Sequence, residues 1–451
     1  MAKSKEMDML NGPLGMKILR FAIPLAATGI LQQLFNAADV AVVGQFAGTT
    51  AMAAVGSNSP IIGLMVNLFV GVSLGTNVVI ARFIGQENKE GVKHAVHTSI
   101  LVALICGVAI AILGELFAPR LLHLLGVPED VLPYSTLYLR IYAAGMPVIL
   151  LYNFESAIFR SQGDTRTPLI CLTVSGIINV VLNLFFVVGL HMSVDGVAIA
   201  TVTSNLVSSA MLFYFLRKHT GLIHVDMKSF KIDFKVLRQI LQIGLPAGLQ
   251  GMVFALSNLS VQSAINSLGS TVMAASSAAF NVEIFLYYLL NSFGQACTTF
   301  VGQNYGAGKL DRCITATRMA LIMDIVVTLI GSALILTFSA KILSIFNADP
   351  AVIANGQIRL KYIVGGEILN TFMEVFSGAL RGYGESLKPA VMTFIGVVGI
   401  RVSWIFLIFP KYPTFETIMI VYPLSWGVTA IAIVAVYIWY KNKYIKPELN
   451  V

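Results

Sequence analysis

Long apolar stretches alternate with short polar ones along almost the entire chain. Most of these stretches have about 20 residues or more, the length that an α-helix needs to cross the hydrocarbon core of a membrane. Backbone groups inside a bilayer must pair within their own segment, so continuous apolar stretches predict helices and exclude the alternating strands of a barrel. The pattern predicts twelve spans, at residues 15–43, 51–80, 92–118, 131–158, 166–189, 194–217, 237–264, 271–300, 314–338, 352–380, 388–410 and 417–440.

Composition and charge support a membrane protein. Hydrophobic residues make up 57% of the chain and charged residues only 12%, whereas soluble domains contain about 25% charged residues. The net charge of +8 does not indicate nucleic-acid binding, because Lys and Arg lie mainly in the tails and in every second loop, while the alternate loops hold only Arg120, Lys341 and Lys411. This asymmetry predicts a multi-pass protein of the cell membrane with both termini in the cytoplasm. The tail MAKSKEMDML does not resemble a signal peptide.

Motifs for soluble chemistry are not found. The four cysteines and six histidines do not follow metal-ligand spacing, so no metal site is expected. In GQNYGAGKL, Gln303 occupies the first glycine position of a phosphate-binding loop and Leu310 follows the lysine, so that loop is not formed. We therefore expect neither an enzyme nor a cofactor other than a coupling ion.

The two halves of the chain resemble each other. Aligning the chain with itself places FAIPLAATGILQQLFN (21–36) over IGLPAGLQGMVFALSN (243–258), and FRSQGDTRTP (159–168) over LRGYGESLKP (380–389). An even number of spans per half gives both halves the same orientation, a parallel repeat typical of secondary transporters. The predicted fold is an all-α integral membrane protein of two pseudo-symmetric six-helix bundles. These are an N-lobe at 1–217 and a C-lobe at 237–451, joined by a cytoplasmic linker at 218–236.

One carboxylate stands alone in the first spans. Asp39 is the only charged residue between Arg20 and Arg82, and it shares a helical face with Gln32 and Asn36. A charge at this depth costs about 2.5–3.5 kcal/mol, so such residues tend to handle ions or protons. A neutral carboxyl hydrogen-bonded inside the bundle is the structural alternative. Further polar positions of the first half are Tyr138, Asn179, Asn183 and Thr201.

The second half carries different polar chemistry. The duplicate of Asp39 falls at Ser260 or Val261, so the carboxylate is present in one half only. Together with two residues of the first half, its polar positions form the candidate substrate-binding set. That set is Gln32, Glu155, Glu283, Tyr287, Asn291 and Glu374. Hydrogen bonding between helices is the alternative role for each of them.

These features resemble the multidrug and toxic compound extrusion (MATE) transporters, in a bacterial and archaeal DinF-like or MepA-like branch. The resemblance rests on NAAD (36–39), FRSQGD (159–164) with its repeat LRGYGE, and the N-x-x-x-N of 179–183. It implies a monomeric antiporter that exports organic cations by alternating access in exchange for H⁺ or Na⁺. The ion-coupling residues would be Asn36, Asp39, Tyr138, Asn179, Asn183 and Thr201. Many relatives have a second aspartate at the position of Asn183, and another branch has a glutamate near Phe254.

Two other functions share parts of this pattern. A flippase for lipid-linked saccharides has the same two-lobe plan but favours several cations in its cavity, and here only Arg140, Arg359, Lys361 and Arg401 lie within or near the spans. A membrane-embedded enzyme acting on lipids would need a catalytic constellation at a membrane face, and the sequence shows none.

Overall fold

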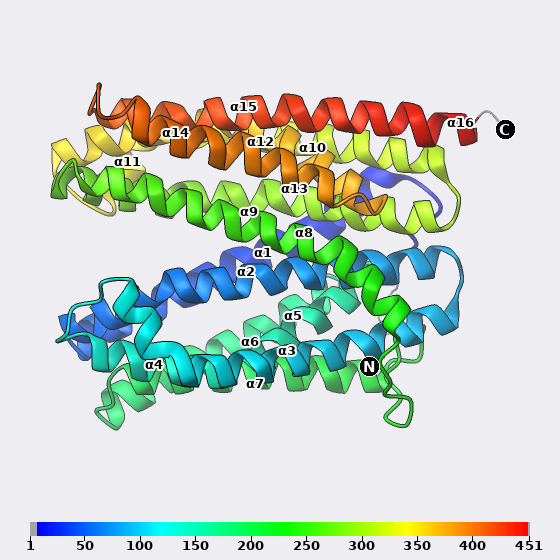
Figure 1. Ribbon diagram of the computed structural model, residues 1–451, viewed down its shortest axis with the longest axis horizontal. Helices are drawn as coiled ribbons and strands as arrows, with labels where there is room; N and C mark the ends of the chain where they lie inside the picture. The colour runs from blue at the N-terminus through cyan, green and yellow to red at the C-terminus, as the bar shows by residue number, and fades with distance from the viewer. Residues whose placement is uncertain (1–6, 450–451) are drawn as a thin grey trace. The chain divides into compact units, whose positions relative to one another are not determined.

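The structure is a computed structural model that describes residues 7–449. The basic tail, residues 1–6, and residues 450–451 lie outside the described part, as do the outermost ends of the predicted lobes. Within the described range every regular element is a helix, which confirms the all-α prediction. The helices are long and lie lengthwise beside one another within each half (Figure 1).

The first half contains seven α-helices and one π-helix. Their bounds are α1 Leu14–Phe46, α2 Thr49–Gly85, α3 Lys89–Leu124, α4 Leu132–Ala144, α5 Met146–Ser161, α6 Arg166–Asn183, η1 Leu184–Gly189 and α7 Val194–Lys218. Those of the second half are α8 Phe234–Asn266, α9 Ser270–Gly306, α10 Leu310–Thr337, α11 Ser339–Ser344, α12 Pro350–Gly382, α13 Leu387–Thr393, η2 Phe394–Gly399, α14 Ile400–Leu407, α15 Phe415–Tyr440, η3 Lys441–Ile445 and α16 Lys446–Leu449.

The predicted spans correspond to these helices. Ten helical segments among the described residues are long and apolar enough to cross a membrane, and the pair α4 and α5 makes an eleventh with a bend of 48°. Pro147 lies in the first turn of α5, where its ring cannot continue the preceding helix, which explains the bend. The predicted span at 352–380 corresponds to α12, which is 33 residues long. It is more polar than the others, because it carries Arg359, Lys361, Glu367, Glu374 and Arg381.

The helices group into two compact units that do not follow the halves of the sequence. Among the described residues, unit 1 comprises residues 7 and 27–248, and unit 2 comprises residues 8–26 and 249–449. The first part of α1 therefore packs within unit 2, and the first part of α8 packs within unit 1. The predicted division at 218–236 stays a prediction for the sequence repeat, whereas packing divides the chain inside α1 and α8.

Glycines explain why the first part of α8 packs within unit 1. A Cβ atom on Gly71 of α2 would overlap the backbone of Gly248, and one on Gly75 would overlap the backbone at Ile240. A Cβ on Gly244 would meet Val72 in the same way. Small residues let two helix backbones approach closely, which is how membrane helices gain packing energy without a hydrophobic driving force.

The amino-terminal segment packs within unit 2 through the residues just before α1 and through the first part of α1. The side chain of Asn304 donates a hydrogen bond to the carbonyl of Met9 at 3.2 Å, and Arg312 donates to the carbonyls of Met9, Asn11 and Gly12 at 3.0–3.2 Å. Farther along α1, the ring of Phe21 lies edge-on to Phe300 with centroids 5.9 Å apart. These contacts fix the start of α1 to α9 and α10.

The segment between α7 and α8 lies against the start of α3. The ring of His97 is hydrogen-bonded to backbone atoms of Asp226, and Lys93 forms an ion pair with the Asp226 side chain at 3.6 Å. His94 contacts the carboxylate of Asp233 at 2.9 Å. The predicted linker is thus an ordered strap on unit 1.

Candidate functional site

The lone acid of α1 is buried and hydrogen-bonded from two other helices. Asp39 is 6% exposed. Its Oδ1 accepts a hydrogen bond from Asn183 Nδ2 on α6 at 2.5 Å, and its Oδ2 accepts one from Thr201 Oγ1 on α7 at 3.1 Å. Three helices of unit 1 therefore converge on one carboxyl group. We call Asp39, Asn179, Asn183 and Thr201 the Asp39 cluster.

Helical spacing places the amides of α6 on one face. Asn179 and Asn183 lie one turn apart, and Asn183 Nδ2 also donates to Asn179 Oδ1 at 3.2 Å. Asn183 Nδ2 serves both partners, whereas its own buried Oδ1 has no hydrogen-bond partner among the described residues. The cluster thus gathers carboxylate, amide and hydroxyl oxygens around one buried point.

No basic side chain of residues 7–449 forms an ion pair with Asp39. A buried charge without a partner is strongly unfavourable, so the carboxyl group needs either a proton or a bound cation. Oxygen ligands of this kind suit hard cations. The Asp39 cluster can therefore alternate between a neutral and a charged state, or hold a small cation.

Two tyrosines of α4 border the cluster, whereas one predicted member lies outside it. Tyr138 is 5% exposed, and its ring stacks on Tyr142 with centroids 6.1 Å apart. Both tyrosines interact electrostatically with Asp39. Asn36 is exposed and is not part of the hydrogen-bonded group, and Gln32 on the same helix is half-buried.

A second acid of unit 1 lies apart from Asp39. Glu155 on α5 is fully buried, and its Oε2 accepts a hydrogen bond from Ser209 Oγ on α7 at 2.9 Å. Thr201, which holds Asp39, precedes Ser209 by eight residues on the same helix, about 12 Å along its axis. Burial places Glu155 in the interior of unit 1, where it is not open to cargo in this conformation.

In unit 2 a predicted substrate residue is occupied by a cation. Arg359 Nε and Nη2 donate to the two carboxylate oxygens of Glu283 at 3.1 and 2.5 Å, and Nη1 donates to Ser276 Oγ at 2.6 Å. The side chains of Arg359 and Glu283 are 6% and 9% exposed. Arginine pairs of this two-pronged type are the strongest in proteins, so Glu283 is a structural partner here.

The remaining predicted residues of unit 2 lie together. Glu374 on α12 accepts a hydrogen bond from Asn291 Nδ2 on α9 at 3.4 Å, and Gln295 donates to Asn291 Oδ1 at 2.7 Å. Tyr287, one turn before Asn291, interacts electrostatically with Glu374. This polar face carries a carboxylate with no ion-pair partner among the described residues.

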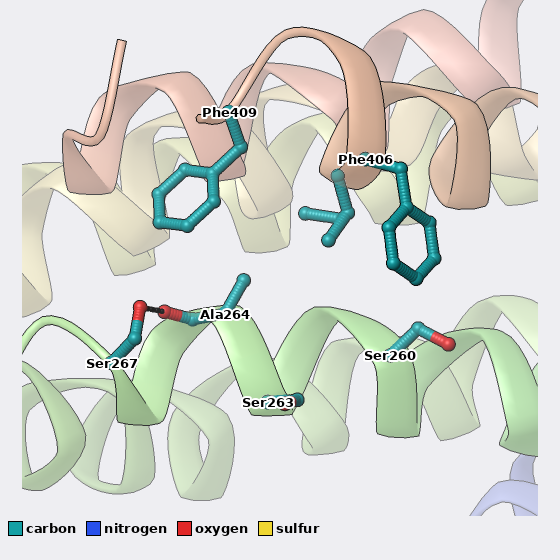
Figure 2. A pocket seen from close by; sticks show the side chains of 7 residues that line it. Ser260, Ser263, Ala264, Ser267, Phe406 and Phe409 are labelled. Carbon is teal, nitrogen blue, oxygen red and sulfur yellow. Dashed lines mark hydrogen bonds between the residues drawn. The ribbon is translucent and has the colours of Figure 1, made fainter. Parts of the chain in front are cut away.

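Unit 2 has a groove beside the position that corresponds to Asp39 in the sequence repeat, which is Ser260 or Val261. The groove has a volume of about 370 Å³ and lies between α8 and the end of α14 (Figure 2). The α8 side contributes the small residues Ser260, Ser263, Ala264 and Ser267. The other side contributes the large apolar residues Ile405, Phe406 and Phe409. The lining carries no charged side chain.

Some polar contacts were not predicted from the sequence. The Glu283–Arg359 ion pair joins residues 76 positions apart, and the burial of Arg401 depends on three other residues from two helices. The occurrence of Arg359 and Arg401 within apolar spans was the only signal for either. Tyr142 lies one helical turn after Tyr138 on α4, and this spacing could have added it to the predicted set.

Comparison with known proteins assigns the family. The family model described as MatE matches twice, at residues 24–185 and 246–407, and these two ranges of equal length confirm the internal repeat. The probable multidrug resistance protein YoeA of Bacillus subtilis is 28% identical over 94% of both chains. The FAD transporter of Shewanella oneidensis is 28% identical over 76% of this chain and 77% of its own.

A solved structure confirms the fold. The outward-facing conformation of a multidrug resistance MATE family transporter superposes with a TM-score of 0.90 at 25% identity, covering 100% of both chains. The likeness over the complete chain confirms the predicted twelve-span fold with two repeats. It also supports a multi-pass protein of the cell membrane, as predicted.

Proposed function

This chain belongs to the MATE family of membrane transporters, and we propose that it exports cationic, amphipathic compounds in exchange for inward H⁺ or Na⁺. As a member of this family it is a transporter and not an enzyme. YoeA and other relatives with multidrug names support the choice of cargo. A buried carboxylate, Asp39, that has no ion-pair partner among the described residues supports the choice of a coupled ion.

The Asp39 cluster supplies the coupling step. When Asp39 carries a proton, its carboxyl group is neutral and costs little to bury. When the proton leaves, the charge must be solvated, paired or exposed, and this favours a different packing of α1 against α6 and α7. A ligand can shift a conformational equilibrium only by its different affinity for the two states. The gain and loss of one cation at Asp39 provides that difference.

Na⁺ would use the same residues in a different way. The oxygens of Asp39, Asn179, Asn183 and Thr201 would be its ligands, with the unpartnered Oδ1 of Asn183 among them. Rocking of two lobes would then expose the cargo site to one side of the membrane at a time. We further propose that the transporter is monomeric and that both termini lie in the cytoplasm, as the distribution of Lys and Arg suggests.

The cargo cation would bind beside Glu374. Its carboxylate has an amide neighbour and an aromatic one, and it forms no ion pair among the described residues, because Arg381 interacts with it only at longer electrostatic range. An organic cation could supply the missing charge, and the ring of Tyr287 could contact its apolar part. Glu283 is less suited to this role because Arg359 already neutralises it.

The test is transport in proteoliposomes with H⁺ and Na⁺ gradients imposed separately. Efflux of ethidium driven by a pH gradient, with acidification of the side that receives the counter-ion, supports H⁺ exchange. Efflux driven by a Na⁺ gradient alone supports Na⁺ exchange. Equal fluxes with either gradient and with none would contradict antiport altogether.

A further inference from the structure

Arg401 on α14 is a fully buried cation within unit 2. It is 1% exposed and lies among three aromatic rings. Its guanidinium carbon is 4.3 Å from the ring centroid of Tyr422, 5.7 Å from that of Trp426 and 5.8 Å from that of Phe254. The rings come from α8 and α15, so two helices of unit 2 enclose this side chain of a third, α14.

The hydrogen bonds of Arg401 are made only to neutral groups. Nε donates to Ser425 Oγ at 3.1 Å, and Nη1 donates to Asn258 Oδ1 at 2.8 Å. Nη2 has no partner among the described residues, and neither has the buried Nε1 of Trp426. Two N–H-bearing groups of one cage, the Nη2 group of Arg401 and the indole Nε1 of Trp426, are therefore unsatisfied.

No carboxylate in the described part of the chain forms an ion pair with Arg401. Glu367 on α12 is the acid that interacts with it electrostatically. That carboxylate is instead hydrogen-bonded by Asn370 Nδ2 at 3.0 Å. Arg359, the nearby second cation, is paired with Glu283. The charge of Arg401 thus lacks a direct counter-charge.

A buried arginine, unlike a buried acid, cannot lose its charge by exchanging a proton. A buried carboxyl group becomes neutral by binding a proton, whereas a guanidinium keeps its charge at any pH at which proteins are folded. Contacts with aromatic rings stabilise a cation but do not satisfy its N–H groups. The missing partner must therefore be an acceptor, and for a buried cation the favoured acceptor is an anion.

We propose that Arg401 Nη2 and Trp426 Nε1 form a binding site for a monovalent anion. The anion is either inorganic chloride or the carboxylate of a transported compound. In the second form the proposal rests on the export function proposed above and extends it to cargo that carries both charges.

The sequence repeat relates this site to the Asp39 cluster of the first half. In the register that aligns the two halves, Arg401 corresponds to Asn179 and Asn258 corresponds to Asn36, while Asp39 corresponds to Val261. The first repeat therefore has an acid, Asp39, where the second has Val261, and the second repeat has a cation, Arg401, where the first has Asn179. The two sites are related in sequence and opposite in the charge of the ion that they bind.

Fluorescence provides a direct test, because the chain has three tryptophans and one of them forms the site. Replacing Trp404 and Trp439 by Phe leaves Trp426 as the only tryptophan. Iodide is both a monovalent anion and a quencher, so binding beside Trp426 should give quenching that saturates with concentration at constant ionic strength. In the Arg401→Gln variant only the linear quenching of random collisions should remain.

Two further variants guard against misfolding and general charge effects. Asn258→Asp places a carboxylate beside Nη1, supplies the missing anion internally and should abolish saturation while keeping the arginine. Arg381→Gln removes a different buried cation of unit 2, which is hydrogen-bonded to Gln250, and should leave saturation unchanged. Linear quenching in the protein that carries only the two tryptophan replacements, or saturation that survives in either Arg401→Gln or Asn258→Asp, would overturn the site.

Competition identifies the source of the anion. Relief of iodide quenching by chloride, with benzoate ineffective, assigns the site to inorganic chloride. Relief by benzoate at lower concentration than chloride assigns it to a carboxylate of the cargo, and Arg401→Gln should then lose transport of a zwitterionic dye but retain that of ethidium. The binding measurement needs no gradient, so its failure would leave the export function intact, and a failure of export would leave the site intact.

Discussion

Arg359 holds both carboxylate oxygens of Glu283 inside unit 2, between α12 and α9. This pair and the Asp39 cluster are two different solutions for an acid within the membrane. Glu283 is permanently neutralised by a cation, whereas Asp39 is surrounded by groups that leave its charge to be balanced by a mobile ion. The distinction separates structural acids from those that can take part in transport.

Breaking the ion pair should destabilise the protein. In Glu283→Gln the buried guanidinium of Arg359 loses its counter-charge, at a cost of about 3–5 kcal/mol. Thermal unfolding in detergent should show a large decrease in midpoint. Glu374→Gln is the matched control, because that carboxylate forms no direct ion pair. Arg381 interacts with it only at longer range and keeps its hydrogen bond to Gln250, so the midpoint should fall much less. Equal midpoints for the two variants would contradict a structural role for the pair.

Glu374→Gln should instead change what is transported. Loss of the negative charge beside Asn291 and Tyr287 should weaken binding of organic cations more than that of neutral compounds of similar size. Transport assays with both classes of cargo would measure the ratio. The dependence on the driving ion should stay as in the unaltered protein, and a changed ion dependence with an unchanged cargo ratio would refute the assignment.

Asp39→Asn should abolish ion-driven efflux without unfolding the protein. The amide keeps the size of the side chain and can still bond with Asn183 and Thr201, but it neither takes up a proton nor neutralises a cation. Ethidium efflux should fall to the background of empty liposomes. Asn36→Ala, on the same helix but exposed and outside the cluster, should retain efflux. Normal efflux by Asp39→Asn would remove the ion-coupling role from this residue.

Gly71→Ala should disturb the packing of α2 against α8 within unit 1. The added Cβ would overlap the backbone of Gly248, and overpacking of this kind costs about 1–3 kcal/mol. Gly56 lies on the same helix, and a Cβ there meets no atom within 4 Å, so Gly56→Ala should be neutral. Thermal midpoints of the two variants in detergent provide the comparison, and indistinguishable values would argue against close backbone contact.

Acid should release the strap between α7 and α8. The hydroxyl of Ser229 and the backbone N–H of Lys228 lower the pKa of Asp226 from 3.8 to about 2, with a smaller contribution from Lys93. The backbone N–H of Val236, followed by the ring of His94, likewise lowers the pKa of Asp233. A lowered pKa means that the carboxylates stabilise the folded turns of the strap and, through Lys93 and His94, its contact with α3 above about pH 4, and that they lose this effect as the pH falls toward 2.

Limited digestion by pepsin, which is active under these conditions, can follow the release. Cleavage within residues 219–233 should be slow at pH 4 and faster at pH 2 by more than the change in pepsin activity on an unstructured peptide. Asp233→Asn should raise cleavage at pH 4. Cleavage that follows pepsin activity alone would show that the carboxylates do not hold the strap.

The sequence predicted the features that depend on one helix at a time. Hydropathy defined the spans, and helical spacing placed Asn179 and Asn183 on one face of α6, where the structure brings them to Asp39. It could not predict contacts set by how helices pack. Asn36 shares a helix with Asp39 and is exposed, because the position of a neighbouring helix decides which side of a face is covered.

Pairing between distant residues could not be predicted from the sequence either, because it also depends on how helices pack. Glu283 and Arg359 each occur in a separate span, and nothing in either span indicates the other. The assignment of Glu283 to a cargo site followed from its charge and from the helical face that it shares with Tyr287 and Asn291, and the structure shows that this charge is already balanced. The division of α1 and α8 between the two units could not be predicted, because the hydropathy of a span indicates its length and not which helices it packs against.

That division has a consequence for biosynthesis. Unit 1 needs residues up to 248, so it stays incomplete on the ribosome until the start of α8 has been made, well after its own last full helix. Unit 2 in turn includes residues 8–26, which are synthesised first and must wait for α9 and α10 before they reach their contacts. Two fragments cut at the strap should therefore mature only when both are produced in the same cell.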